Sequence, residues 1–133
     1  MQFDHERLDV YRVALDFLVH ADAVIRGLPR GRAYFCDQLG RAALSIVLNI
    51  AEGAGKVSAG DKRRYYLSAR GSATEAAALY DALSRIGLLE EAVQLGGKQM
   101  LMRIVSMLVK LARNLESSRS AISSQPGEGG GEL

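Results

Sequence analysis

A row of polar side chains along an otherwise apolar helix is the feature that most constrains how this chain folds. The row is formed by Gln38, Arg41, Ser45, Asn49 and Glu52. Successive members are three or four residues apart, so they fall on one stripe of a helix. A bundle held together by apolar contacts alone has no use for such a stripe. Its hydrogen-bonding groups therefore need partners.

Apolar residues recur at helical spacing in several segments, and none of them shows the alternation of a strand. The pattern predicts helices over about residues 6–28, 34–54, 58–86 and 98–119. Ser58 is expected to cap the third helix, and Gly87 to end it. The pair Gly96 and Gly97 is expected to separate a short helical turn at 89–95 from the last helix. Short links between amphipathic helices predict an all-α fold, an antiparallel up-and-down four-helix bundle.

The length of 133 residues suits one domain that buries its own core. We expect the bundle to occupy residues 1–120, and the Ser-, Gly- and Glu-rich segment 121–133 to be disordered. Cys36 is the only cysteine, which excludes an intrachain disulfide, and the charged segment 1–10 is unlike a secretory signal. The longest apolar stretch, 42–51, is too short to span a bilayer. These features predict a cytoplasmic protein without a membrane segment.

The apolar residues of helix 34–54 cover more of its circumference than one core needs. They spread over roughly 200° of a helical wheel. A helix that faces a single core shows a stripe only a little wider than about 100°. The excess predicts a second buried surface, most simply against another copy of the chain, and we expect a homo-oligomer.

Helix 58–86 supplies polar partners for the row. Ser72 and Glu75 share one line of this helix, with Arg70 beside it, and an ion pair between Arg41 and Glu75 is expected. We interpret the polar groups as a structural network that ties the second helix to the third. The network consists of Gln38, Arg41, Ser45, Asn49, Glu52, Arg70, Ser72 and Glu75. The alternative is that the same row lines a ligand or catalytic pocket.

Several strings resemble a known family. They are "RAALSI" at 41–46, "NIAEGAG" at 49–55 and "ARGSATE" at 69–75, with "LDVYRVALD" at 8–16 and "LSRIGLLEEA" at 83–92. The chain resembles the four-helix-bundle proteins encoded in intervening sequences of bacterial 23S ribosomal RNA genes. The same family includes the accessory variability protein of diversity-generating retroelements.

The resemblance covers about residues 7–115. It implies a barrel-shaped homo-oligomeric ring, with a homopentamer as the expected assembly. For the retroelement branch it also implies binding to nucleic acid and to a reverse transcriptase.

Positive charge is concentrated in the middle of the chain. Residues 30–70 hold eight basic and three acidic side chains, although the whole chain has a net charge of only +2. The candidate nucleic-acid-binding residues are Arg30, Arg32, Lys56, Lys62, Arg63 and Arg64. Tyr65 beside them is suited to stacking on a base. The prediction is a non-enzymatic accessory protein that binds structured RNA or DNA through repeated basic turns. The alternatives are a solvated basic turn without a ligand and a scaffold that recruits a protein partner.

No residue set predicts an enzyme, a cofactor site or a metal site. The string "GAGKVS" at 53–58 resembles a phosphate-binding loop, but Ile50 and Val57 stand where that motif needs glycine and Ser or Thr. Glu52 and Glu75 are the best acid–base or metal pair, yet neither has a histidine at the spacing of a metal centre.

Three further side chains are assigned structural or surface roles. His5 and His20 lie on the first helix without ligand spacing, and His20 is expected at the surface. Cys36 is expected to act as a small apolar residue in or near the apolar face of helix 34–54.

Overall fold

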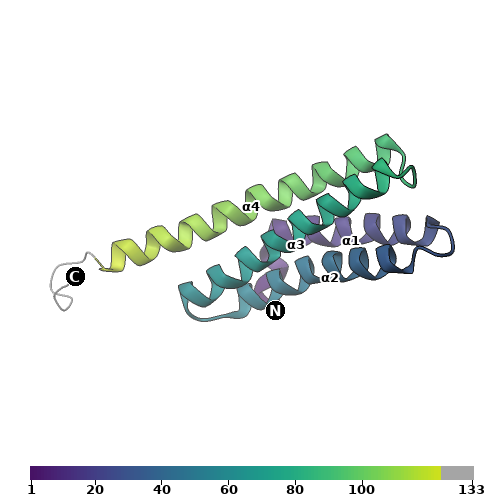
Figure 1. Ribbon diagram of the computed structural model, residues 1–133. Coiled ribbons are helices and arrows are strands. Elements are labelled where there is room, and N and C mark those ends of the chain that lie inside the picture. Colours follow the sequence, from purple (N-terminus) through teal and green to yellow (C-terminus); the bar gives the residue numbers. More distant parts are fainter. Residues whose placement is uncertain (124–133) are drawn as a thin grey trace.

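The chain folds into antiparallel helices packed side by side (Figure 1). The computed structural model describes the backbone of residues 1–123 and the side chains of residues 1–116. Its elements are the 3-10 helix η1 (Asp4–Arg7) and the α-helices α1 (Asp9–Gly27), α2 (Ala33–Gly55), α3 (Ala59–Arg85) and α4 (Glu91–Ser123). Consecutive α-helices pack against each other, and α1 also packs against α4. No strand occurs within residues 1–123, and the predicted all-α four-helix bundle is confirmed.

The links between helices alternate between the two ends of the bundle (Figure 1). The α1–α2 link (28–32) and the α3–α4 link (86–90) lie at one end. The α2–α3 link (56–58) lies at the other end, where α4 runs on past the start of α3. Side chains in successive links are therefore separated by the length of a helix.

The boundaries of α3 follow from local chemistry, as predicted. The Ser58 hydroxyl accepts a hydrogen bond from the backbone N–H of Asp61 at 3.1 Å, which caps the first turn. Gly87 has φ of 83°, a left-handed conformation that glycine adopts without strain. The backbone N–H of Leu88 donates to the Leu83 carbonyl at 2.9 Å, which closes a Schellman motif.

The first periodic segment is interrupted, so its prediction as one helix from residue 6 is wrong. The chain forms η1, passes through the extended residue Leu8 (φ −90°, ψ 128°) and then begins α1. The reason is tertiary, because η1 packs against α2 instead of continuing the axis of α1.

The last helix is continuous through Gly96 and Gly97, so the predicted break there is also wrong. Gly97 is a place of close approach, whereas at Gly96 an added Cβ would make an ordinary van der Waals contact. A Cβ atom at position 97 would lie 2.7 Å from Tyr80 Cδ2 and closer still to Cε2, and one at position 96 would lie 3.7 Å from His20 Nε2. Glycine costs a helix about 1 kcal/mol relative to alanine, and here that cost is offset by the space it leaves for the Tyr80 ring.

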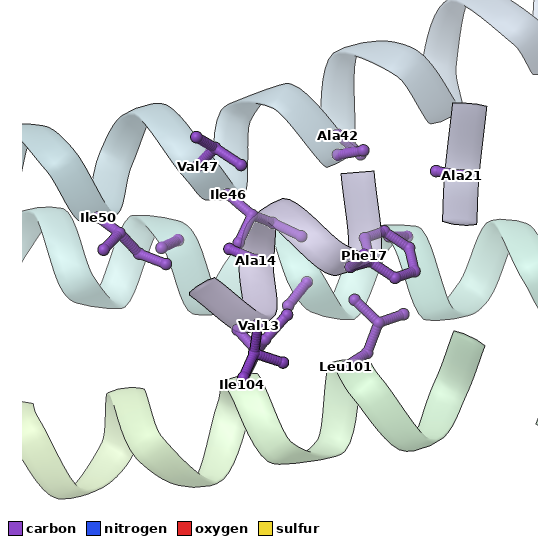
Figure 2. Packing of buried hydrophobic residues seen from close by; sticks show 14 of the residues in the cluster. Val13, Ala14, Phe17, Ala21, Ala42, Ile46, Val47, Ile50, Leu101 and Ile104 are labelled. Carbon is purple, nitrogen blue, oxygen red and sulfur yellow. The ribbon is translucent and has the colours of Figure 1, made fainter. Parts of the chain in front are cut away.

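The core lies between all the α-helices and is apolar. Figure 2 shows Phe17 of α1, Ile46 of α2 and Leu101 of α4 directed into the same interior. Tyr80 of α3 is also fully buried. Tyrosines apart, no polar or charged side chain of residues 1–116 is fully buried, so the polar row of α2 is not part of this core.

The helix α4 ends at Ser123, beyond the predicted end of the bundle at residue 120. Most of the tail predicted to be disordered, residues 124–133, lies outside the described residues. None of the helices in residues 1–123 combines the length and the hydropathy needed to cross a bilayer.

Candidate nucleic-acid interface and polar row

Among the described side chains, the polar row is hydrogen-bonded to α3 through Ser45, which Asn49 contacts in turn from the same helix. The hydroxyls of Ser45 and Ser72 lie 2.9 Å apart, and Asn49 donates to the Ser45 carbonyl at 2.9 Å and to its hydroxyl at 3.0 Å. All three side chains are half-buried. This short chain of hydrogen bonds is the connection between α2 and α3 that the sequence predicted.

The other members of the predicted network do not join it. Gln38, Arg41 and Glu52 are exposed, and Glu52 pairs with Lys56 at 3.4 Å. No Arg41–Glu75 ion pair occurs among the described side chains, so that prediction is wrong for a single chain. The outer part of the row therefore faces solvent.

Arg70 faces α4 and not α2, which corrects its assignment to the network. It lines a groove between α3 and α4, whereas Ser72 contacts α2. Two residues correspond to roughly 200° around a helix, so neighbours at this spacing point to opposite sides. Proximity in the sequence therefore does not place Arg70 and Ser72 on one face.

The exposed part of the row borders an open apolar groove on the outer surface of α2. Leu44 and Leu48 are 46% and 54% exposed, and they line a hollow of about 290 Å³ together with Arg41 and Glu52. Leu48 and Glu52 also line an adjoining hollow of about 420 Å³, which Phe3 borders. The excess apolar surface predicted for this helix is thus present and uncovered in a single chain.

Two of the four basic side chains around the α2–α3 link bind to a neighbouring helix. The Lys62 ammonium donates to the carbonyls of Ala54 at 2.7 Å and Gly53 at 3.5 Å, so it satisfies the C-terminus of α2. Arg63 turns to α4 and pairs with Glu116 at 3.2 Å.

The other two basic side chains flank an aromatic ring. Lys56 Nζ and the Arg64 guanidinium each lie 5.2 Å from the centre of the half-buried Tyr65 ring. Lys56 also pairs with Glu52, and Arg64 pairs with Asp61 at 3.5 Å. Lys56, Arg64 and Tyr65 therefore form a compact cation–aromatic cluster at this end of the bundle.

Arg30 and Arg32 lie at the opposite end of the bundle and do not join this cluster, which corrects the predicted set. The helix α2 has 23 residues, so it spans about 34 Å between the two links. Arg32 donates instead to the Tyr34 hydroxyl at 2.9 Å. The candidate nucleic-acid-binding residues are thus divided between two ends of the molecule (Figure 1).

Sequence reasoning missed a basic groove between α3 and α4. Arg63, Arg70 and Arg113 line a hollow of about 270 Å³ over the apolar residues Leu67 and Val109. The spacing of Arg63, Leu67 and Arg70 was a signal for one helical face. Only the packed structure shows that this face meets Arg113 of α4.

His20 is half-buried, so its prediction as a surface residue is wrong. Its Nδ1 lies 2.7 Å from the Tyr80 hydroxyl, and burial lowers its pKa from the ordinary value of 6.5. Burial also raises the pKa of Tyr80. In the neutral imidazole with Nε2 protonated, the Tyr80 hydroxyl donates to Nδ1.

The remaining chemical groups show no metal-site geometry. Cys36 is half-buried on α2, with its Sγ 4.0 Å from the Ile25 carbonyl oxygen. Across the part of the chain that the structure describes, no three His, Cys, Asp or Glu side chains gather to hold a metal ion.

Comparisons with known proteins agree with the fold. Residues 6–110 match the model of a family described as 23S rRNA-intervening sequence protein. Among solved structures, the chain is similar to a protein of unknown function from the S23 ribosomal protein family of Bacteroides thetaiotaomicron VPI-5482, with a TM-score of 0.73 and 20% sequence identity. That match covers 78% of this chain and 95% of the other and shows a shared fold. No curated protein matches the chain. Because the family model spans most of its length, the chain belongs to the 23S rRNA-intervening sequence protein family.

Proposed function

We propose that the chain is a non-enzymatic, homo-oligomeric accessory protein that binds structured RNA or DNA at the α2–α3 end of the bundle. The observation that carries the proposal is the cluster in which Lys56 and Arg64 flank the Tyr65 ring. Cations beside an aromatic ring suit a nucleotide, because the cations meet phosphate oxygens and the ring meets a base or sugar.

The ion pairs in the cluster do not prevent this role. Both Lys56–Glu52 and Arg64–Asp61 are formed by partly exposed side chains close together in the sequence. Pairs of this kind are worth about 0 to 1 kcal/mol. A phosphate oxygen is therefore able to replace either carboxylate at little cost.

Assembly would multiply these contacts. Leu44 and Leu48 leave an apolar surface open on α2, and a second copy of the chain is the simplest cover for it. In a ring, with a pentamer as the form suggested by the family resemblance, each copy presents its own cluster, and binding to one polyanion becomes multivalent. Light scattering at micromolar concentration tests this part, because a particle mass near 14.4 kDa contradicts it.

The binding test compares the two ends of the bundle. Fluorescence anisotropy with a labelled RNA hairpin and a DNA duplex is measured from low to high salt for the wild type and two double variants. Lys56→Ala with Arg64→Ala should weaken binding about tenfold near 0.1 M salt and lower the log–log salt slope by about 2. The matched control, Arg30→Ala with Arg32→Ala, removes the same charge at the far end and should leave the slope unchanged.

Two outcomes contradict the proposal. One is the absence of binding by the wild type even at low salt. The other is an equal loss in both double variants, which would show a response to total charge and not to a site. Lys62 is left intact because its bonds to Gly53 and Ala54 make any loss ambiguous.

A second candidate function is a scaffold that recruits a protein partner. The groove of Phe3, Leu44 and Leu48 favours it, because its apolar lining suits a protein side chain better than a phosphate. Leu48→Glu should then abolish capture of a partner from nuclease-treated lysate, while the Lys56 and Arg64 variant should retain it. The reverse pattern contradicts the scaffold.

A further inference from the structure

The groove between α3 and α4 concentrates cations that have few partners of their own. Among residues 1–116, three arginines line it and Glu116 is the one carboxylate that does. Glu116 pairs with Arg63. Arg70 and Arg113 are exposed, and neither forms an ion pair with any side chain in residues 1–116. The groove therefore holds more positive charge than the side chains of residues 1–116 neutralise.

The hydrogen-bonding capacity of the groove is also unfilled. Arg63 Nε is buried and has no hydrogen-bond partner within the described residues. A guanidinium carries its N–H donors in a planar fork that matches the oxygens of a phosphate. Guanidiniums from both walls of one hollow of about 270 Å³ thus offer a tetrahedral anion more donors than a single side chain could.

The surface of α3 next to Arg70 is unobstructed. Gly71 follows Arg70 on α3, is exposed, and has no atom within 4 Å of the place where a Cβ would lie. Arg64, which flanks the Tyr65 ring, follows Arg63 of the groove in the sequence of α3.

We propose that the α3–α4 groove is a phosphate-binding site in which Arg70 and Arg113, assisted by Arg63, hold a phosphate group. This inference rests on the proposed function for its main source of phosphate, the backbone of a bound nucleic acid. The same chemistry also suits free pyrophosphate or a nucleotide. The apolar floor of Leu67 and Val109 accepts the sugar or base that accompanies the phosphate.

The main test removes the two arginines that lack partners. Arg70→Ala with Arg113→Ala should weaken binding of the RNA hairpin about tenfold near 0.1 M salt and lower the salt slope by about 2. The matched control is Arg85→Ala with Arg103→Ala, which takes exposed arginines from the same two helices outside the groove. An unchanged affinity in the groove variant, or an equal loss in the control, overturns the proposal.

A variant that removes a negative charge from the groove should have the opposite effect on binding. Glu116→Gln removes the carboxylate that neutralises Arg63 but keeps a side chain of similar size. Binding of the hairpin should tighten by several-fold, and the salt slope should rise. Weaker binding by a folded Glu116→Gln protein overturns the proposal.

Two further measurements distinguish a phosphate site in the groove from a contact between copies of the chain. A calorimetric titration with pyrophosphate measures whether the protein binds a phosphate compound that is not part of a nucleic acid. Binding that is lost in the groove variant but retained in the Lys56 and Arg64 variant supports the groove even where the wild type binds no RNA. Light scattering reports assembly. If the groove variant dissociates the oligomer while pyrophosphate does not bind the wild type, the groove is a protein interface and the proposal fails.

Discussion

Two buried tyrosines of α3 lie against glycines of neighbouring helices, and they differ in how firmly they are held. Tyr66 faces Gly53 of α2, and Tyr80 faces Gly97 of α4. A Cβ at position 53 would lie 2.9 Å from Tyr66 Cε1, whereas one at position 97 would lie 2.7 Å from Tyr80 Cδ2 and closer still to Cε2. Both glycines allow close helix packing, but the space beside Tyr80 is tighter.

The surroundings of the two rings explain the difference. Tyr80 is fully buried, its ring centre lies 5.5 Å from that of Phe17, and its hydroxyl is bonded to His20. Tyr80 therefore joins three helices, and it cannot move without disturbing all of them. Tyr66 lies near the α2–α3 link, and no hydrogen bond joins its hydroxyl to another of the described side chains. A packed three-helix junction should respond to substitution more strongly than a contact near a link.

The largest expected effect comes from Gly97→Ala. The added methyl group overlaps the Tyr80 ring, and overpacking of a rigid core typically costs about 1 to 3 kcal/mol. Because Tyr80 is held from three sides, we expect a loss of about 3 kcal/mol, near the top of that range. Urea unfolding at a fixed protein concentration measures it.

The control for this prediction is Gly71→Ala on the exposed face of α3. A Cβ there meets no atom within 4 Å, so the gain in helix propensity of about 1 kcal/mol should appear undiminished. If Gly97→Ala is as stable as the wild type, the close packing at Tyr80 is not what fixes a glycine at that position.

A smaller loss is expected for Gly53→Ala. Its Cβ would meet Tyr66 Cε1 at 2.9 Å and Tyr65 Cβ at 3.0 Å, so the Tyr66 ring has to shift, but by less than the Tyr80 ring would beside position 97. Part of this cost is offset by the better helix propensity of alanine, and a net loss of about 1 kcal/mol remains. Differential scanning calorimetry of both alanine variants checks the ranking. A larger loss at Gly53 than at Gly97 would reverse the comparison of the two tyrosines.

Removal of the Tyr80 hydroxyl should cost less than the overlap at Gly97. Tyr80→Phe keeps the ring against Gly97 but leaves His20 Nδ1 without its partner. The net worth of such a hydrogen bond is about 1 kcal/mol. Tyr66→Phe is the matched control and should change the unfolding free energy less. Equal losses in the two variants would show that the His20 contact adds nothing to the junction.

Sequence reasoning predicted the parts of this molecule that depend on local chemistry. The cap at Ser58 and the left-handed conformation of Gly87 each follow from neighbouring residues. The helical spacing of the apolar residues predicted the four-helix bundle. The role of Gly97 could not be predicted in the same way, because a glycine that breaks a helix and a glycine that admits a ring look alike in sequence. Only the partner, Tyr80, distinguishes them, and it lies on another helix.

The candidate site was predicted less well, for a related reason. Arg30 and Lys56 are both basic link residues, yet an up-and-down bundle places successive links at opposite ends. The predicted topology already implies that separation, although the charge pattern alone does not. Arg70 and Arg113 could not be paired in advance, because their meeting depends on the rotation of α3 and α4 about their axes.

The smallest expected effect is a dependence of stability on pH that comes from His20 at the Tyr80 junction and has no counterpart at the Tyr66 contact. Burial lowers the pKa of His20 below its ordinary value of 6.5, so the folded state favours the neutral imidazole. The unfolded chain binds the proton more readily, and stability is therefore fully present above pH 6.5 and falls as the pH drops toward the lowered pKa. The pKa of Asp81 is lowered by its hydrogen bonds from Lys98 and then Gln94, and its contribution is lost only as the pH falls below about 3.8.

The contributions of His20 and Asp81 to the free energy of unfolding change in different pH ranges, so they can be measured separately. Urea unfolding just below pH 6.5 should show a shallower decline for His20→Gln than for the wild type, because glutamine accepts the Tyr80 hydrogen bond but does not titrate. At the other end of α3 the pKa of Tyr66 is raised, first by burial and then by Asp4, so this tyrosine does not titrate in the same range. Parallel curves for the wild type and His20→Gln would mean that His20 carries its proton as easily in the bundle as in the unfolded chain. The Tyr80 junction would then differ from the Tyr66 contact in packing alone.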